Sequence, residues 1–481
     1  MFSVFDLTLV AGVLTPVVFL LGGLSALDAV MNARTPQGAT AWAISLISLP
    51  LLTLPLYWIF GRSTFDDYIG AMDRFEADVL PGIDRSDLEP YRMPPEDRKD
   101  LRERIEIEGF RRLATQPFTR GNRLDLLIDG EATYAALFEA IDAAEAYVFT
   151  QFYIIHDDEI GTAYQQALIR AAERGVDVRL LYDVVGSHKL PERYLDALRK
   201  AGVRTSAFGG RRRWLRRFRL NFRNHRKITV VDGRVGFVGG LNMGDEYLGR
   251  DESIGPWRDT HLRAEGPVVQ GLQVSLMQDW FYSAGEAPEL SWTPSPSPSD
   301  QCALVLASGP ADDLETCGLL FVHAIESAEK RVWIATPYFV PDGRVLGALQ
   351  LAALRGVDVR VLMPRTSDSL LFKFVPYAYF PEIERAGVKV YLYEEGFMHQ
   401  KVLLVDEDYA AIGTANFDNR SFRLNFEATC LANDAKLCAE VASMLEHDLD
   451  RSTRLHRDDL TSQSKPFRLA VQGTRLLAPV L

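Results

Sequence analysis

Cysteine is scarce in this sequence: only four occur among 481 residues, and all of them lie in its second half. They are Cys302, Cys317, Cys430 and Cys438, and none of them belongs to a C-x-x-C motif. The count and the spacing give no sign of a disulfide framework or of a cysteine-based zinc site. We expect the four thiols to be buried as small hydrophobic side chains.

An excess of positive charge is also lacking, because the formal net charge is -12 and the isoelectric point is about 5.3. A nucleic-acid-binding protein needs a broad basic surface, so we do not expect nucleic acid as a partner. One segment differs: residues 211–227 contain nine arginines or lysines and no acid, interleaved with Trp214, Phe218 and Phe222. A solvated loop or a nucleic-acid patch could have this composition, but next to membrane helices it favours a surface for anionic lipid headgroups.

Charged residues are absent from two long stretches near the N-terminus, residues 7–27 and 38–61. As a helix, the first stretch would cover about 30 Å, the thickness of a bilayer's hydrocarbon core. A signal peptide would carry lysine or arginine ahead of the apolar run, whereas only Asp6 precedes it. Two buried core helices are the other alternative. Two such runs in tandem favour a transmembrane hairpin with spans at about 7–27 and 39–60.

The rest of the chain is an internal duplication of alternating strands and helices. The segment RGVDVRLL at Arg174 recurs as RGVDVRVL at Arg355, and the Pro/Ser run between the halves is typical of a linker. We predict an α/β fold with two similar lobes, each a mixed β-sheet flanked by helices, after the hairpin. The predicted parts are a hairpin at 1–62, a connector at 63–120, a first lobe at 121–290, a linker at 291–300, a second lobe at 301–450 and a tail at 451–481.

Each lobe carries one copy of a His-x-Lys pattern, and the two copies are in matched register. The first contains His225, Lys227, Asp232 and Asn242, and the second contains His399, Lys401, Asp406 and Asn416. Residues two apart in a strand project from the same face, so each copy presents an imidazole beside an ammonium group. The Gly-Gly or Gly-Thr pair before each asparagine allows a tight backbone path that can return the amide to the same mouth. A single copy would carry little weight, but two long copies predict one composite site.

This residue set suits a phosphate group better than a metal ion. A protonated lysine cannot be a metal ligand, so we expect no metal. The cation can neutralise phosphate oxygens, one neutral imidazole can attack phosphorus, and one protonated imidazole can release the leaving alkoxide. Asp232 and Asp406 are included among the candidate catalytic residues, although their position at the strand end favours an ion-pair or turn role.

The doubled pattern H-x-K-x(4)-D-x(6)-G-G/T-x-N resembles that of the phospholipase D superfamily. Further segments are similar to bacterial cardiolipin synthases within it: WRDTH at Trp257, TPYFVPD at Thr336 and GTANFDNRSFRLNFE at Gly413. The resemblance covers nearly the whole chain. It implies two phospholipase-D-like lobes, a multi-pass anchor in the bacterial inner membrane, and chemistry without a cofactor.

The resemblance also implies a role for each candidate residue. His225 would be the nucleophile and His399 the general acid. The groups that hold the phosphate would be Lys227, Lys401, Asn242 and Asn416. Family members carry an acid that orients each imidazole. Glu427 fits this role for His399, and Asp259 is assigned to His225 on the assumption of a short insertion.

The activity implied by the resemblance is transfer of a phosphatidyl group between two phosphatidylglycerol molecules through a phosphohistidine. The products would be cardiolipin and glycerol, and the partners would be this anionic phospholipid and the membrane. Two alternatives stay open from the residues. One is a hydrolase with the same site, for which water is the acceptor and phosphatidic acid the product. The other is a non-catalytic membrane scaffold.

Overall fold

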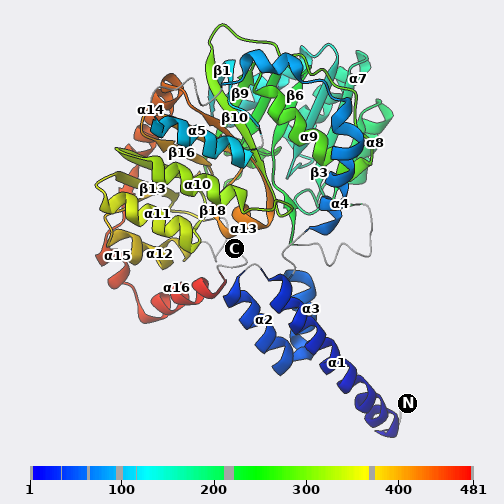
Figure 1. Ribbon diagram of the computed structural model, residues 1–481, viewed down its shortest axis with the longest axis vertical. Coiled ribbons are helices and arrows are strands. Elements are labelled where there is room, and N and C mark those ends of the chain that lie inside the picture. The colour runs from blue at the N-terminus through cyan, green and yellow to red at the C-terminus, as the bar shows by residue number, and fades with distance from the viewer. Residues whose placement is uncertain are drawn as a thin grey trace. The chain divides into compact units, whose positions relative to one another are not determined.

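The computed structural model describes residues 4–33, 35–61, 65–93, 101–114, 116–210, 221–367 and 374–477. The chain divides into two units, one made of residues 1–69 with 212–222 and the other of residues 70–211 with 223–481. The first unit holds the N-terminal helices, and the second holds the duplicated sheet (Figure 1).

The N-terminal unit contains α1 (Val4–Asn32), α2 (Pro36–Ser48) and α3 (Pro50–Phe60). Within the described chain, one helical segment, Leu14–Asn32, is long and apolar enough to cross a membrane. The predicted second span, 39–60, is divided at Leu49 into α2 and α3. The cause is Pro50, which lacks a backbone N–H and whose ring clashes with the carbonyl group of the preceding turn. The expectation of a continuous second span is therefore wrong.

Polar groups near this break find partners inside the same unit. Thr53 Oγ1 donates to the carbonyl oxygens of Ser45 (3.1 Å) and Leu49 (2.8 Å). The hydroxyl group of Tyr57 on α3 donates to the carboxylate of Asp28 on α1 (2.6 Å). In an apolar environment, polar groups must be satisfied internally, and these bonds meet that requirement.

The contact between α1 and the α2–α3 break depends on a glycine. A Cβ atom at Gly22 would lie 2.6 Å from the carbonyl oxygen of Leu46 and 2.8 Å from Cβ of Pro50, whereas one at Gly23 would meet nothing within 4 Å. We expect Gly22→Val to destabilise the helix bundle by about 1–3 kcal/mol, because overpacking a tight contact costs that much. Thermal unfolding in detergent and limited proteolysis of the hairpin would measure the effect. Gly23→Val is the matched control, and equal effects of the two variants would refute the contact.

Among the described residues, one sheet of 16 strands runs through the larger unit: 15 strands follow one continuous order, and β5 (Arg223–Asn224) pairs with β19 (Asn425–Ala432) outside that order. The strand order of its first half is β1 (Thr119–Ile128), β9 (Thr260–Glu265), β7 (Val235–Gly239), β6 (Ile228–Val231), β2 (Tyr147–Phe152), β3 (Asp177–Asp183) and β4 (Arg204–Phe208). The second half repeats this order with β10 (Gln301–Ser308), β19 (Asn425–Ala432), β17 (Tyr409–Gly413), β16 (Val402–Val405), β11 (Arg331–Ala335), β13 (Asp358–Pro364) and β14 (Lys389–Tyr393), and adds β20 (Ser452–Arg454). Antiparallel pairing of β1 with β10 joins the halves. The predicted α/β fold with two similar lobes and mixed sheets is confirmed.

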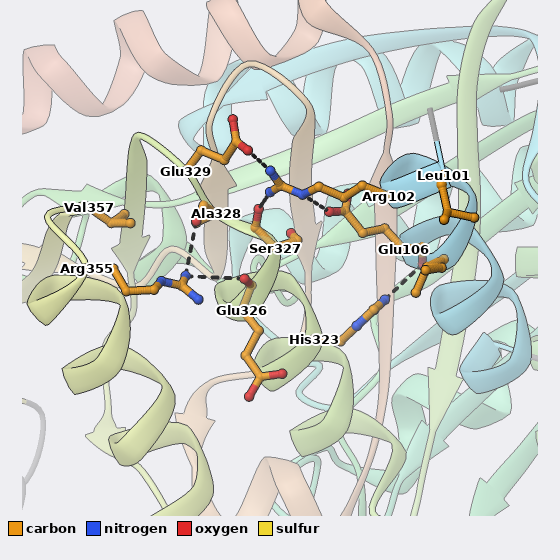
Figure 2. A pocket seen from close by; sticks show the side chains of 11 residues that line it. Leu101, Arg102, Glu106, His323, Glu326, Ser327, Ala328, Glu329, Arg355 and Val357 are labelled. Carbon is orange, nitrogen blue, oxygen red and sulfur yellow. Dashed lines mark hydrogen bonds and ion pairs between the residues drawn. The ribbon is translucent and has the colours of Figure 1, made fainter. Parts of the chain in front are cut away.

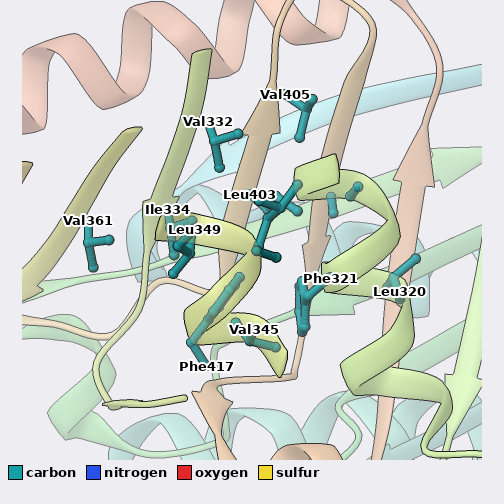
Figure 3. Close-up of a cluster of buried hydrophobic side chains, with 14 of the residues drawn as sticks. Leu320, Phe321, Val332, Ile334, Val345, Leu349, Val361, Leu403, Val405 and Phe417 are labelled. Carbon is teal, nitrogen blue, oxygen red and sulfur yellow. The ribbon is translucent and has the colours of Figure 1, made fainter. Parts of the chain in front are cut away.

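Helices flank the sheet in both lobes (Figure 1). They are α6 (Asp129–Asp142), α7 (Glu159–Glu173), α8 (Glu192–Lys200) and α9 (Val269–Ala284) in the first lobe, and α10 (Thr316–Ser327), α11 (Gly343–Leu354), α12 (Val375–Glu384) and α14 (Ala435–Asp450) in the second. Figure 3 shows the core of the second lobe: Val332 and Ile334 alternate along β11, and Val345 and Leu349 lie one turn apart on α11. Each such buried side chain contributes roughly 1.5–3 kcal/mol, so this alternation fixes which face of β11 joins this core, while the intervening Trp333 is buried on the other face.

Segments from the predicted connector and tail join the same core or sheet. Helix α5 (Leu101–Ala114) buries Ile107 and Phe110 in the second-lobe core, and β20 pairs with β14. The predicted linker at 291–300 contains no helix or strand. The domain boundaries stay a prediction. All four cysteines are buried, so the burial predicted for the thiols is confirmed.

Candidate active site

Two short parallel bridges between the lobes position the two histidines. β5 (Arg223–Asn224), just before His225, pairs with the start of β19. β15 (Phe397–Met398), just before His399, pairs with β8 (Trp257–Arg258). The backbone N–H of His225 donates to the carbonyl oxygen of Phe426 (3.0 Å), and that of His399 donates to the carbonyl oxygen of Arg258 (2.7 Å). Each histidine is thereby hydrogen-bonded to the opposite lobe.

The side chain of each histidine contacts an acid of the other lobe. This acid comes one residue after the paired residues of the bridging strand. His225 Nδ1 lies 3.0 Å from both carboxylate oxygens of Glu427, and His399 Nδ1 lies 2.7 Å from Asp259 Oδ2. Both carboxylates are fully buried. The pairs are therefore crossed between the lobes, and the same-lobe pairing inferred from the sequence is wrong. The reason is that the bridges connect each histidine to the other lobe's strand, which an offset along one lobe does not reveal.

The two lysines lie directly beside their histidines. Lys227 Nζ donates to the carbonyl oxygen of His225 (2.6 Å), and Lys401 Nζ lies 2.8 Å from Nδ1 of His399 and also donates to its carbonyl oxygen. Both lysines are buried. Two histidines, two lysines and two acids from both lobes thus converge in one centre.

Burial and mutual charge set the protonation of this centre. Burial lowers the pKa of His225 to about 4 and that of His399 to about 3, and the neighbouring lysines add to both shifts. Burial would raise the pKa of Glu427 and Asp259, but the interactions with the facing histidine and lysine side chains bring both below their ordinary values. At neutral pH both imidazoles of the unliganded centre are therefore neutral and both carboxylates are ionised.

The pKa of Lys227 predicts an alkaline limb in the pH profile. Burial, with help from Lys401, lowers this pKa to about 7, so the ammonium group loses its proton as the pH rises through that value. An uncharged amine cannot neutralise phosphate, so kcat/KM should fall above about pH 7. We expect Lys227→Arg to move the limb to higher pH, because a guanidinium group stays protonated. A kcat/KM profile with an unchanged limb in this variant would contradict the assignment.

The two asparagines lie in the loops after the next strand of each lobe. Asn242 Oδ1 accepts from the backbone N–H of Ile154 (3.1 Å), and its Nδ2 donates to the hydroxyl group of Tyr247 (2.9 Å). Asn416 Nδ2 donates to Asp418 (3.2 Å), while its Oδ1 is buried without a partner among the described residues. Both amides therefore also hold their own loops, and their role towards phosphate stays a prediction.

Asp232 and Asp406 do not face the centre. Each carboxylate accepts three backbone N–H groups at the start of a neighbouring strand: Glu145, Ala146 and Tyr147 bind Asp232, and Glu329, Lys330 and Arg331 bind Asp406, all within 2.9 Å. Five residues along a strand from each lysine amount to about 16 Å. Including these two aspartates among the catalytic candidates is therefore wrong, and the structural role favoured by their position is the one observed.

Asp232→Asn should accordingly reduce stability more than catalysis. Both aspartates have left-handed backbones, with φ of 53° and 50°, which asparagine also tolerates, so the change keeps the backbone but removes the charge and replaces one of the two acceptor oxygens by an NH2 group. We expect the free energy of unfolding to fall by about 1–3 kcal/mol, the value of hydrogen bonds to a charged acceptor. Chemical denaturation would measure this, with the exposed Asp196→Asn as control. A large loss of kcat in folded Asp232→Asn protein would restore a catalytic role.

Gly240 and Thr414, each two residues before an asparagine, lie against the buried acid of the same lobe. A Cβ atom at Gly240 would lie 2.0 Å from Oδ1 of Asp259. At the equivalent place in the second lobe, the Thr414 hydroxyl group donates to Glu427 Oε2 (2.5 Å). The Gly-Gly and Gly-Thr pairs thus allow their loops to approach the orienting acids closely.

Several residues near the centre were not identified from the sequence. The ring of Tyr153 lies edge-on to His225, and the ring of Trp257 lies against His399, each at 5.0 Å between centroids. His261 is buried near Asp259 and Lys227, and burial lowers its pKa to about 3. WRDTH contains two of these residues, Trp257 and His261, but the sequence gives no sign that Trp257 contacts the histidine of the other half.

A second polar region lies away from this centre. A pocket of about 930 Å³ is formed between α5 and the end of α10 (Figure 2). Its two arginines bind an acid or backbone: Arg102 pairs with Glu106 (2.8 Å), and Arg355 donates to the carbonyl oxygen of Ala328 (3.1 Å). None of the predicted site residues lines it, so we assign it to the packing of α5 on the second lobe.

Headgroup binding by the basic segment and the absence of a metal ion both stay predictions. Residues 211–220 of the basic segment 211–227 lie outside the described residues, so headgroup binding by this segment stays a prediction. In the described ranges, no cluster of three or more histidine, cysteine or acidic side chains could hold a metal ion. The donor set of the centre itself, with two buried lysines, is unsuited to a cation.

Comparison with known proteins agrees with this geometry. The family model described as "Cardiolipin synthase, PLD-like domain" matches residues 137–265 and again 321–449, one match in each lobe. A model of the phospholipase D-nuclease N-terminal region matches residues 20–62. This match overlaps the candidate span, and together they indicate association with a membrane.

Individual relatives agree with the family match, and a solved structure shares the fold. Two proteins named cardiolipin synthase A, from two strains of Pseudomonas fluorescens, are 45% and 47% identical to this chain, covering 98% and 96% of both sequences respectively. Phosphatidylserine synthase of Haemophilus influenzae shares the fold, with a TM-score of 0.57 at 15% identity over 78% of this chain and 100% of that one. The chain therefore belongs to the cardiolipin synthase family of the phospholipase D superfamily.

Proposed function

We propose that this chain is a membrane-anchored phosphatidyltransferase that joins two phosphatidylglycerol molecules into cardiolipin and releases glycerol. The observation that carries the proposal is the composite centre, in which two crossed His–acid pairs flank two buried lysines. Such a centre offers a nucleophile, a proton donor and fixed positive charge, which are the groups a phosphodiester transfer requires.

In the first step, the donor phosphate binds beside Lys227 and Lys401, and Nε2 of His225 attacks phosphorus. Glu427 holds Nδ1 of this imidazole and stabilises the positive charge that develops on the ring. The bond between phosphorus and the glycerol oxygen breaks, and protonated His399 gives its proton to that oxygen. Glycerol leaves, and the phosphatidyl group stays bound to His225.

In the second step, the same groups act in reverse. Neutral His399 takes the proton from a hydroxyl group of a second phosphatidylglycerol, and the resulting oxygen attacks phosphorus. The P–N bond to His225 breaks, and cardiolipin is released with His399 again protonated. The cycle consumes no proton, and Asp259 orients His399 in both steps.

Substrate binding favours the protonated form of His399. In the unliganded centre, burial and then the lysine charges lower the pKa of this imidazole. A bound phosphodiester brings a negative charge between the lysines and opposes their effect. Proton uptake on substrate binding follows from this, so the charged imidazole forms only when a phosphate is present to use it.

The proposed anchor is the N-terminal helix bundle in the bacterial inner membrane. The segment Leu14–Asn32 would form one crossing. The broken pair α2–α3 would form the second, since helix interruptions are tolerated in membranes where neighbouring helices satisfy the exposed backbone. The donor and acceptor lipids then reach the centre from the bilayer in which the enzyme is anchored.

The test is the reaction of detergent-purified full-length protein in phosphatidylglycerol vesicles containing EDTA, with products measured by mass spectrometry. We expect cardiolipin and free glycerol in equal amounts. Phosphatidic acid as the sole product would mean that water is the acceptor and that the chain is a hydrolase. Absence of turnover on phosphatidylglycerol would refute the proposed substrate.

A further inference from the structure

Two buried aspartates have equivalent places in the two lobes. Asp279 on α9 comes 20 residues after the orienting acid Asp259, and Asp448 on α14 comes 21 residues after Glu427. Each helix is the next element after β9 or β19, the strand that begins just after its acid or contains it. Both carboxylates are fully buried. The duplication has therefore kept a buried carboxylate at this place in each lobe.

Asp279 binds a buried arginine inside the first His-x-Lys motif. Nη1 of Arg226 donates to both carboxylate oxygens of Asp279 (2.8 Å each). The same guanidinium group donates from Nε to the carbonyl oxygen of Glu427 (3.0 Å) and from Nη2 to that of Ser308 (3.1 Å). Glu427 is the acid that meets His225, so Arg226 connects the α9 carboxylate to the strand that carries this acid.

Asp448 binds a buried arginine next to the other orienting acid. Arg258 donates from Nε and Nη2 to the two carboxylate oxygens of Asp448 (2.8 and 2.9 Å). Its Nη1 donates to the carbonyl oxygen of Asp259 (2.7 Å). The carbonyl oxygen of Arg258 itself accepts the backbone N–H of His399 (2.7 Å). This arginine therefore holds the backbone of both the acid and the histidine of the second half-site.

The two half-sites form the same connection with arginines from different positions in the sequence. Arg226 lies within the His-x-Lys motif, whereas Arg258 immediately precedes the acid. The residue equivalent to Arg226 in the second motif is Gln400, whose amide donates to Asp448 (2.8 Å). In both half-sites a guanidinium group thus joins a buried helix carboxylate to the carbonyl oxygen of the orienting acid, although the lobes do not share the position of the arginine.

Burial of these pairs gives little net stability by itself. Arg226 and Arg258 are only 3% and 4% exposed, and the two aspartates are fully buried, so all four charges have lost their hydration. The desolvation of such a pair can exceed its Coulomb attraction, and apolar residues of similar volume are often as stable. A guanidinium group, however, fixes the direction of its bonds as well as supplying charge. Its use at both orienting acids therefore points to a role in geometry.

We propose that the two Arg–Asp pairs position the orienting acids. The Arg226 pair holds Glu427 towards the nucleophile, and the Arg258 pair holds Asp259 towards the histidine that transfers the proton. This inference rests on the proposed function, which assigns the roles of the two histidines. No step of the proposed reaction uses the paired side chains directly, so they act through the acids.

The test removes each pair without leaving a fully buried charge. The first double variant is Arg226→Met with Asp279→Asn, and the second is Arg258→Met with Asp448→Asn. In each, the new amide can still accept from a neighbouring side chain, such as Asn224 or Gln400. Two donors are compared in the first turnover. Glycerol release from phosphatidylglycerol needs a proton, whereas nitrophenolate release from a phosphatidyl ester of p-nitrophenol does not.

We expect the first double variant to be roughly 10- to 100-fold slower with both donors, as a shift of a catalytic group by about 1 Å can cause. The second should be slower by a similar factor with phosphatidylglycerol alone. The matched control is Arg179→Met with Asp177→Asn, because the buried Arg179 pairs with Asp177 (3.1 Å) and Glu286 (3.0 Å), outside the centre. It should keep both rates.

Chemical denaturation would establish the folded fraction of each variant, and rates are compared per folded protein. If a double variant does not fold, Arg226→Lys or Arg258→Lys replaces it, since lysine keeps the charge and loses the fixed guanidinium geometry. Wild-type rates in both folded variants would overturn the proposal, as would an equal loss with both donors in the Arg258 variant. Glycerol release does not depend on the acceptor, so a wild-type protein that yields only phosphatidic acid would refute the proposed transferase and leave both comparisons intact.

Discussion

Replacing His225 or His399 by asparagine is expected to abolish cardiolipin formation, with kcat falling at least about 10,000-fold. His225 forms the bond to phosphorus, and His399 moves the proton in both steps, so neither role has a substitute among the groups described in the centre. Asparagine keeps a polar side chain in each buried position. Cardiolipin formed in phosphatidylglycerol vesicles would be measured by mass spectrometry.

The control for these variants is His447→Asn, because His447 is an exposed histidine in the last turn of α14. It should keep wild-type activity. The variants should also keep the wild-type unfolding temperature to within a few degrees, which separates chemistry from folding. More than about a tenth of wild-type turnover in either active-site variant would be incompatible with a catalytic role for that histidine.

Glu427→Gln and Asp259→Asn are expected to lower kcat roughly 100- to 10,000-fold, as the loss of an imidazole-orienting carboxylate does. The crossed contacts predict which histidine each variant resembles. Glu427 meets His225, so its loss should impair the nucleophile. Asp259 meets His399, so its loss should impair proton transfer to the leaving group.

A phosphatidyl ester of p-nitrophenol separates the two classes, because nitrophenolate leaves without a proton. We expect its release to recover in His399→Asn and Asp259→Asn, and to stay slow in His225→Asn and Glu427→Gln. Absorbance of nitrophenolate in the first turnover would measure this. If Asp259→Asn instead behaved like His225→Asn, and Glu427→Gln like His399→Asn, the acids would act within their own lobes and the crossed arrangement would be wrong.

The fold and most residues of the active centre could be predicted from the sequence. The recurrence of RGVDVR and the matched spacing from His225 and His399 to their asparagines identified a duplication, and the sheet repeats its strand order accordingly. The strands β3 and β13 are buried along most of their length, and their short apolar, valine- and leucine-rich runs depend only on neighbours in the chain.

Features that depend on contacts between distant segments could not be predicted in the same way. Distance along the sequence cannot say whether Glu427 meets His399 or His225, because parallel bridges between the lobes decide it. The break at Leu49 could be predicted from Pro50 in the apolar run. Membrane helices tolerate proline, however, so Pro50 alone did not decide between a broken and a continuous helix.

The most direct test of the account is rapid chemical quenching of the wild-type enzyme with phosphatidylglycerol, followed by peptide mass spectrometry. The account predicts a phosphatidyl adduct on the peptide containing His225, formed and consumed at the rate of cardiolipin synthesis, and no adduct in His225→Asn. An adduct on His399 alone would reverse the roles of the two histidines. Cardiolipin formed at full rate with no adduct on either histidine would contradict the covalent transfer itself.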